Sequence, residues 1–133
     1  MGFTVHEYVD WPSGYVPGKV EHYDQWRWAE PYVRYAELIS SPTGVADMAA
    51  EHRRIWMEAV LAVADGQAAL VISSGGVIEP ALVACLPDAE HIAWGAPVGH
   101  CEGARLGFDK GRFVSVEFAR TPRVASQSPA HCT

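Results

Sequence analysis

The most constraining feature of this chain is a continuously apolar run, Ala68 to Ile72, that leads directly into Ser73-Ser74-Gly75-Gly76. A short apolar run bounded by turn residues is typical of a strand that is buried on both faces of a sheet. The residues that follow, about 77–86, are apolar over a helical length, with Pro80 expected in the first turn. The sequence therefore predicts a buried strand over Ala68–Ser73, a turn and a helix.

A turn of this kind is suited to binding an anion. The first N–H groups of a helix have no partner within it and lie at the positive end of the helix dipole. Ser73, Ser74, Gly75 and Gly76 are therefore the candidate ligand-binding residues. The turn has hydroxyls and glycines but no histidine or lysine, so it is equipped to hold an anion and poorly equipped to transfer one.

The remaining pattern predicts one α/β domain over residues 1–119 and a flexible tail over 120–133, which is rich in Pro, Ser and Thr. We expect a layered sheet of mainly parallel strands, flanked by helices, with an antiparallel hairpin at one edge. The other expected elements are a strand at 3–9, a helix at 20–38 that Pro31 interrupts, the clearest helix at 45–65, a short helical piece at 90–94, and hairpin strands at 101–108 and 113–119.

Charge and composition exclude several classes of partner. The net charge of -6 argues against nucleic acid or an anionic membrane surface, and no apolar run has the length of a membrane span. The three cysteines are widely spaced, which indicates no disulfide framework and a cytoplasmic location. The scattered histidines and cysteines predict no metal site, and nothing in the sequence indicates a cofactor.

Seven aromatic residues are concentrated in a short N-terminal stretch, and they leave two interpretations open. They pack into the core, or they form a lid or an interface with a partner. These residues are Trp11, Tyr15, Tyr23, Trp26, Trp28, Tyr32 and Tyr35.

From about Val45 to Phe118 the chain resembles the histidine phosphatase, or phosphoglycerate-mutase-like, superfamily. In that family a helix leads into an apolar strand that ends in Ser-His-Gly-Gly, followed by a helix and later by a hairpin. Here residues 72–78, Ile-Ser-Ser-Gly-Gly-Val-Ile, and residues 106–113, Leu-Gly-Phe-Asp-Lys-Gly-Arg-Phe, match those two segments. The resemblance implies the C-terminal half of that fold. It also places Glu7 near the family's acidic general acid and His100 near a pocket-lining position.

The departures from the family decide what the resemblance implies for activity. The chain contains no Arg-His-Gly motif, which carries the family's phosphate-accepting histidine, and it has Ser74 where the second family histidine stands. Phosphoryl transfer depends on positioned positive charge, and these groups are missing. We expect a degenerate family member that binds a small anionic or phosphorylated ligand or a protein partner, without phosphoryl transfer by this chain alone.

Two further interpretations stay open. The chain is an enzyme, either completed by a partner chain or using a repurposed pocket with Glu7, Ser74 and His100 as its catalytic groups. Alternatively, the resemblance is accidental and the fold is an unrelated small α/β or α+β domain. Because the family's central strands are absent, we also predict sheet edges that require a partner, and therefore a homo-oligomer or hetero-assembly.

Overall fold

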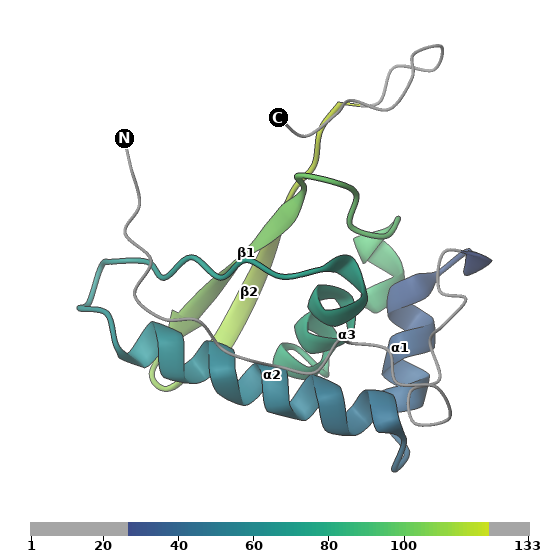
Figure 1. Cartoon of the computed structure of the whole chain (residues 1–133), viewed down its shortest axis with the longest axis horizontal. Coiled ribbons are helices and arrows are strands. Elements are labelled where there is room, and N and C mark those ends of the chain that lie inside the picture. The colour runs from purple at the N-terminus through teal and green to yellow at the C-terminus, as the bar shows by residue number, and fades with distance from the viewer. Residues whose placement is uncertain (1–26, 123–133) are drawn as a thin grey trace.

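The computed structural model describes residues 27–122 of the chain (Figure 1). Within that range the protein is α/β, with three α-helices, a short 3-10 helix and one two-stranded antiparallel sheet. The elements are α1 (Pro31–Ile39), α2 (Gly44–Leu61), α3 (Gly75–Cys85), η2 (His91–Trp94), β1 (Gly103–Asp109) and β2 (Arg112–Ala119). The parallel strand pairs expected from the sequence are absent from the described residues.

The first two helices begin where local chemistry favours a helix start. Pro31 stands in the first turn of α1, where its missing N–H costs nothing, and the predicted interruption at this proline is therefore the start of the helix. Thr43 caps α2, because its hydroxyl accepts the Ala46 N–H at 3.1 Å and donates to the Leu38 carbonyl at 2.7 Å. The hydroxyl thus joins the end of α1 to the start of α2.

Helix α3 is the centre of the core, since it packs against both α1 and α2. Leu82 and Val83 of α3 are almost fully buried, as are Tyr32 and Tyr35 of α1 and Val45 of α2. Pro80 lies in the middle of α3 and not in its first turn, because the helix already begins at Gly75.

The hairpin forms as predicted around Asp109-Lys110-Gly111. Lys110 and Gly111 both have positive φ, of 51° and 79°, as a two-residue type I′ turn requires. Apolar side chains from both strands pack against the helical core, among them Leu106, Val116 and Phe118, and Phe113 is itself buried. In Figure 1 the hairpin, α3 and α1 stand above the long helix α2.

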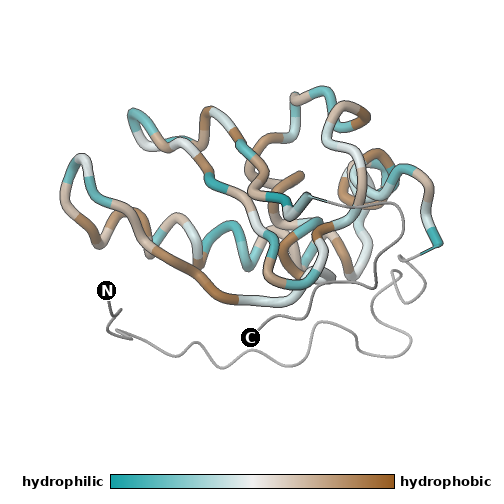
Figure 2. The backbone as a smooth tube through the Cα atoms, turned by 90° about the horizontal axis from the view of Figure 1, so that it is seen from above, coloured by the Kyte–Doolittle hydropathy of each residue, from teal (hydrophilic) through white to brown (hydrophobic). Residues whose placement is uncertain are grey.

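The connection between α2 and α3 departs most from the prediction. Residues 68–74 form no strand, and every one of them is exposed; the predicted buried strand over Ala68–Ser73 is therefore wrong for the chain by itself. Leu70 is 66% exposed and Ile72 is 88% exposed. The physical reason is that no described strand lies beside this segment to pair with its backbone. Figure 1 shows it running back from the end of α2 to the start of α3, and Figure 2 shows it as a continuous hydrophobic stretch.

Other expectations fall partly or wholly beyond the described residues. Tyr32 and Tyr35 lie in the core, and Trp28 packs edge-on against Tyr35 with 5.1 Å between ring centroids, so core packing is the correct interpretation for these aromatic residues. The predicted strand at 3–9 and most of the predicted tail lie outside the described range. Over residues 27–122 no helix is both long and apolar enough to cross a membrane.

Candidate functional site

The candidate site is the first turn of α3. Ser74 is the N-cap residue in an extended conformation (φ -106°, ψ 156°), and its hydroxyl does not cap the helix. Its carbonyl oxygen accepts the N–H groups of Val77 at 3.0 Å and Ile78 at 2.8 Å. The N–H groups of Gly75 and Gly76 have no acceptor among the described residues. Two backbone donors are thus available at the positive end of an eleven-residue helix.

The predicted ligand-binding residues lie together at this turn. Ser73 and Ser74 are exposed, and Gly75 and Gly76 are half-buried, so the turn lies at the surface of the described structure.

The three predicted catalytic residues are not brought together in the described part of the chain. Glu7 lies outside the described residues. His100 is exposed on the loop before β1, and neither its ring nor the Ser74 hydroxyl makes a hydrogen bond to a residue within 27–122. A serine without a base to take its proton is a weak nucleophile, so this part of the structure offers no activation for Ser74.

A carboxyl group that the sequence analysis did not single out lies against the same turn. Glu79 is 3% exposed, and its Oε2 accepts the Val98 N–H at 3.2 Å while its Oε1 has no partner. Oε2 also lies 3.2 Å from the point where a Cβ on Gly75 would stand. Burial raises the pKa of Glu79 to about 7, against the lowering effects of the Val98 N–H and of Arg120.

Glu79 belongs to a cluster of polar side chains that also contains Tyr32, Arg120 and Glu102. Burial and the nearby Glu79 carboxylate raise the pKa of Tyr32, and the neighbouring Arg120 guanidinium lowers it. The Arg120 guanidinium donates to the carbonyls of Trp94 at 2.6 Å and Pro97 at 3.3 Å and lies 3.9 Å from Glu102 Oε2. Arg120, predicted as the first residue of a loose tail, therefore ties the end of β2 to the loop after η2.

A shallow hollow in the described surface lies beside this cluster. It has a volume of about 240 Å³ and is lined by Trp94, Gly95, Ala96, Arg120 and Thr121. It is shallow and mainly apolar, and the one charged group on its wall already binds two carbonyl oxygens.

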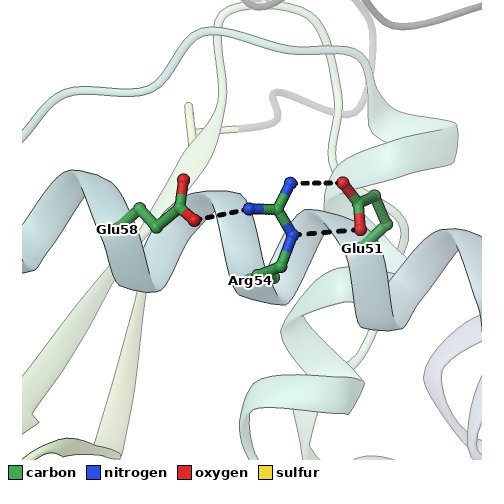
Figure 3. A network of polar contacts seen from close by, with 3 residues as sticks. All are labelled: Glu51, Arg54 and Glu58. Carbon is green, nitrogen blue, oxygen red and sulfur yellow. Dashed lines mark hydrogen bonds and ion pairs between the residues drawn. The ribbon is translucent and has the colours of Figure 1, made fainter.

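Two arginines on the first two helices form ion pairs with carboxylates of their own helices. Arg54 lies between Glu51 and Glu58 on the exposed side of α2 and forms ion pairs with both, as Figure 3 shows. Arg34 pairs with Glu37 at 2.9 Å on α1. These pairs agree with the solvated helix face that such alternating charges indicate.

The described residues contain no group of three or more His, Cys, Asp or Glu side chains that could hold a metal ion. Cys85 is a buried free thiol whose pKa burial raises to about 12. Cys101 is disulfide-bonded, a single bond that the spacing of the three cysteines, interpreted as no disulfide framework, did not predict.

One signal in the sequence could have identified Glu79. It is the single charged residue in an otherwise apolar helix of eleven residues, and an isolated acidic residue among core positions is seldom buried without a specific role. Tyr32 and Arg120 carry no such local signal, because their proximity to Glu79 depends on how α1 and β2 pack.

Comparison of the chain with protein-family models, with curated proteins and with solved structures found no match in any of the three.

Proposed function

We propose that this chain is a binding protein that holds a small anionic or phosphorylated ligand at the first turn of α3 and performs no phosphoryl transfer by itself. The observation that carries the proposal is the pair of unpaired N–H groups, Gly75 and Gly76, at an accessible helix N-terminus. Donors of this kind bind phosphate and similar oxyanions. The turn Ser73-Ser74-Gly75-Gly76 itself carries no cationic side chain of the kind that would stabilise a transferring phosphoryl group.

The resemblance to the histidine phosphatase superfamily enters this proposal as a second argument. The order of α2, α3 and the hairpin supports it, although residues 68–73, the expected strand of the family motif, form no strand here. On this proposal the chain is a degenerate member, a pseudoenzyme with Ser74 in place of a reactive imidazole. A layered, mainly parallel sheet then exists only when further strands join the exposed segment.

We further propose that the chain works in an assembly, because the segment 68–72 is exposed and apolar on both of its faces. A strand with two apolar faces is stable only between neighbouring strands and under covering layers. Pairing of this segment with a strand of a second copy or of another protein would bury Leu70 and Ile72. The enzyme alternative, with Glu7, Ser74 and His100, requires that such a partner or the N-terminal residues complete the site.

The anion site is tested with a matched pair of variants at Gly75. Gly75→Pro removes one N–H donor, and proline is tolerated in the first helical turn after an extended residue such as Ser74. Gly75→Ala adds a Cβ at the same point beside Glu79 Oε2 and keeps the donor. Titration with inorganic phosphate, followed by amide chemical shifts, should move the Gly76 resonance in the wild type and in Gly75→Ala.

Gly75→Pro should weaken phosphate binding at least about fivefold relative to Gly75→Ala, since one charge-assisted hydrogen bond is lost. Equal binding by the two variants would contradict the site. The purified chain should release no inorganic phosphate from a small phosphomonoester. Turnover that survives Ser74→Ala would contradict both the binding role and the enzyme alternative at Ser74.

The assembly is tested by light scattering. Ile72→Lys puts a charge on the proposed pairing strand, whereas Ile92→Lys changes an isoleucine on η2 that is 63% exposed but lies outside that strand. We expect the wild type and Ile92→Lys to form dimers at micromolar concentrations and Ile72→Lys to be monomeric. A monomeric wild type would remove homo-oligomerisation and leave a different partner chain as the remaining form of the proposal.

A further inference from the structure

The buried carboxyl group of Glu79 lies where it must affect any anion at the first turn of α3. Glu79 follows Gly75 by four residues, and helical side chains point back toward the N-terminus, over the preceding turn. The distance of 3.2 Å between Oε2 and the Gly75 Cβ position places the carboxyl group directly against the backbone of that turn. Its other oxygen, Oε1, has no hydrogen-bond partner.

An ionised carboxylate in this position would oppose an anion. Like charges within about 4–6 Å disfavour each other strongly where water is excluded, and Glu79 is almost fully buried. A neutral carboxylic acid has the opposite effect, because it carries no charge and can donate one hydrogen bond. The occupant that suits this turn is therefore an oxyanion together with one proton.

We propose that an oxyanion binds at the first turn of α3 together with one proton from solvent, and that Glu79 holds that proton. The inference rests on the anion site proposed above and specifies how that site is regulated. The only covalent change is the transfer of one proton, which leaves hydronium or a buffer acid and forms an O–H bond on the Glu79 carboxylate. Sulfate, phosphate and phosphomonoesters share the chemistry that the two glycine donors recognise.

The surroundings of Glu79 favour the neutral acid in the resting protein. From α1, Tyr32 and Tyr35 face it; from the end of β2, Arg120 lies within electrostatic reach; and the loop before β1 supplies only the Val98 N–H. Glu102 interacts with Tyr32 and Arg120 from the start of the hairpin.

The other buried titratable groups do not account for a change of anion affinity near neutral pH. On α2 the buried titratable group is His52, whose pKa burial lowers below its ordinary value. Without an adjacent cation paired to it, Glu79 has a pKa of about 7. Its charge therefore changes in the range where the binding of a permanently charged anion can be measured.

The test uses inorganic sulfate, which stays doubly charged from pH 5.5 to pH 8.5, so that only the protein titrates. Isothermal titration calorimetry of the wild type should show an affinity that falls by up to about tenfold per pH unit above the pKa of the free protein, as one coupled proton requires. Glu79→Gln keeps the shape of the neutral acid and cannot ionise. Its affinity should stay within about twofold over the same range and exceed that of the wild type at pH 8.5 by at least about tenfold.

Glu102→Gln serves as the matched control, because Glu102 is the other carboxyl of the cluster with a nearly buried side chain. This variant should keep the pH dependence of the wild type. A second measurement needs no variant: in buffers with different ionisation enthalpies, the wild type should take up as much as about three-quarters of a proton per sulfate near pH 7.5, because about a quarter of Glu79 is already protonated there.

The two possible failures are distinct. If sulfate binds to the wild type with no proton uptake, or with the same pH dependence in Glu79→Gln, the role of Glu79 is wrong and the anion site stands. If sulfate binds neither protein at any pH and no shift occurs at Gly75 or Gly76, the anion site itself is wrong.

Discussion

Helix α3 and the segment that leads into it are both apolar, but the helix is buried and the segment is exposed. Leu82 and Val83 of α3 are 1% exposed, whereas Leu70 and Ile72 of the segment are 66% and 88% exposed. A helix satisfies its own backbone and needs only one neighbour for its side chains. A strand needs a second strand for its N–H and C=O groups before its side chains can be buried.

This difference shows that apolar composition predicts burial only when the backbone partners are present. The first turn of α3 lies at the boundary between the two regions. The candidate ligand site is thus formed by the end of the segment that lacks a partner and the start of the helix that has one. Pairing of the segment with another strand and binding of a ligand at Gly75 and Gly76 would therefore occur next to each other in the structure.

The strongest test of the contrast is a matched pair of leucine truncations. Leu82→Ala should lower the free energy of unfolding by about 3–5 kcal/mol, because it leaves a cavity among α1, α2 and the hairpin. Leu70→Ala should change it by less than about 0.5 kcal/mol, because its side chain is already in water. Urea unfolding at low protein concentration, where the monomer prevails, measures both. A loss above 1 kcal/mol in Leu70→Ala would show that the segment is buried in solution.

The next largest effect concerns Glu79, the buried acid of helix α3. The pKa of Glu79 is about 7 in the folded protein and 4.5 ordinarily. Between these two values the folded protein holds a proton that the unfolded chain lacks, so stability falls as pH rises from 4.5 to 7 and is level above. Over this pH range the free energy of unfolding should fall by up to about 3 kcal/mol.

Glu79→Gln should remove that part of the pH dependence and be more stable than the wild type at pH 8 but not at pH 4.5. His52 works in the other direction, because burial lowers its pKa and favours its neutral form. Stability linked to His52 is lost as the pH falls below its ordinary value of 6.5. Thermal unfolding of both proteins across this pH range separates the two groups, and parallel curves would contradict the assignment to Glu79.

The same contrast explains which parts of the fold could be predicted from the sequence. The helices expected at 45–65 and 77–86, the break at residues 40–43 and the hairpin turn at Lys110-Gly111 depend on local signals such as spacing, caps and glycine, and these were predicted within a few residues. The helix expected at 20–38 is different, because within the described range it begins only at Pro31. The segment 68–73 has the local signals of a buried strand, but the strands that would pair with it are not among the described residues. A local sequence pattern does not show whether another strand is present to pair with this segment.

The candidate site divides in the same way. Ser74, Gly75 and Gly76 are adjacent in sequence, so their placement at a helix start was predictable. The Glu79–Tyr32–Arg120 cluster joins α3, α1 and the end of β2, and only tertiary packing brings these three side chains together. The predicted partnership of Ser74 and His100 was of this second kind, and the described structure does not provide it.

A smaller effect tests the junction between α1 and α2. Thr43→Ala removes the hydroxyl that accepts the Ala46 N–H and donates to the Leu38 carbonyl. It should cost about 1 kcal/mol, as the loss of a helix cap commonly does. Thr43→Ser keeps the hydroxyl and should recover most of that loss in urea unfolding. Equal losses in both variants would assign the effect to the methyl group and not to the cap.

The smallest expected effect is at the ion pairs of Arg54. This side chain joins Glu51 and Glu58 along the exposed side of α2 (Figure 3), where water and salt screen the attraction. Arg54→Ala should leave the melting temperature nearly unchanged in 0.15 M salt, and any difference from the wild type should shrink further at 0.5 M. It should also leave sulfate binding unchanged, because Arg54 is already paired with carboxylates on its own helix. Weaker sulfate binding in Arg54→Ala would mean that the anion is held by side-chain charge, and it would remove the reason for placing the ligand at the backbone donors of Gly75 and Gly76.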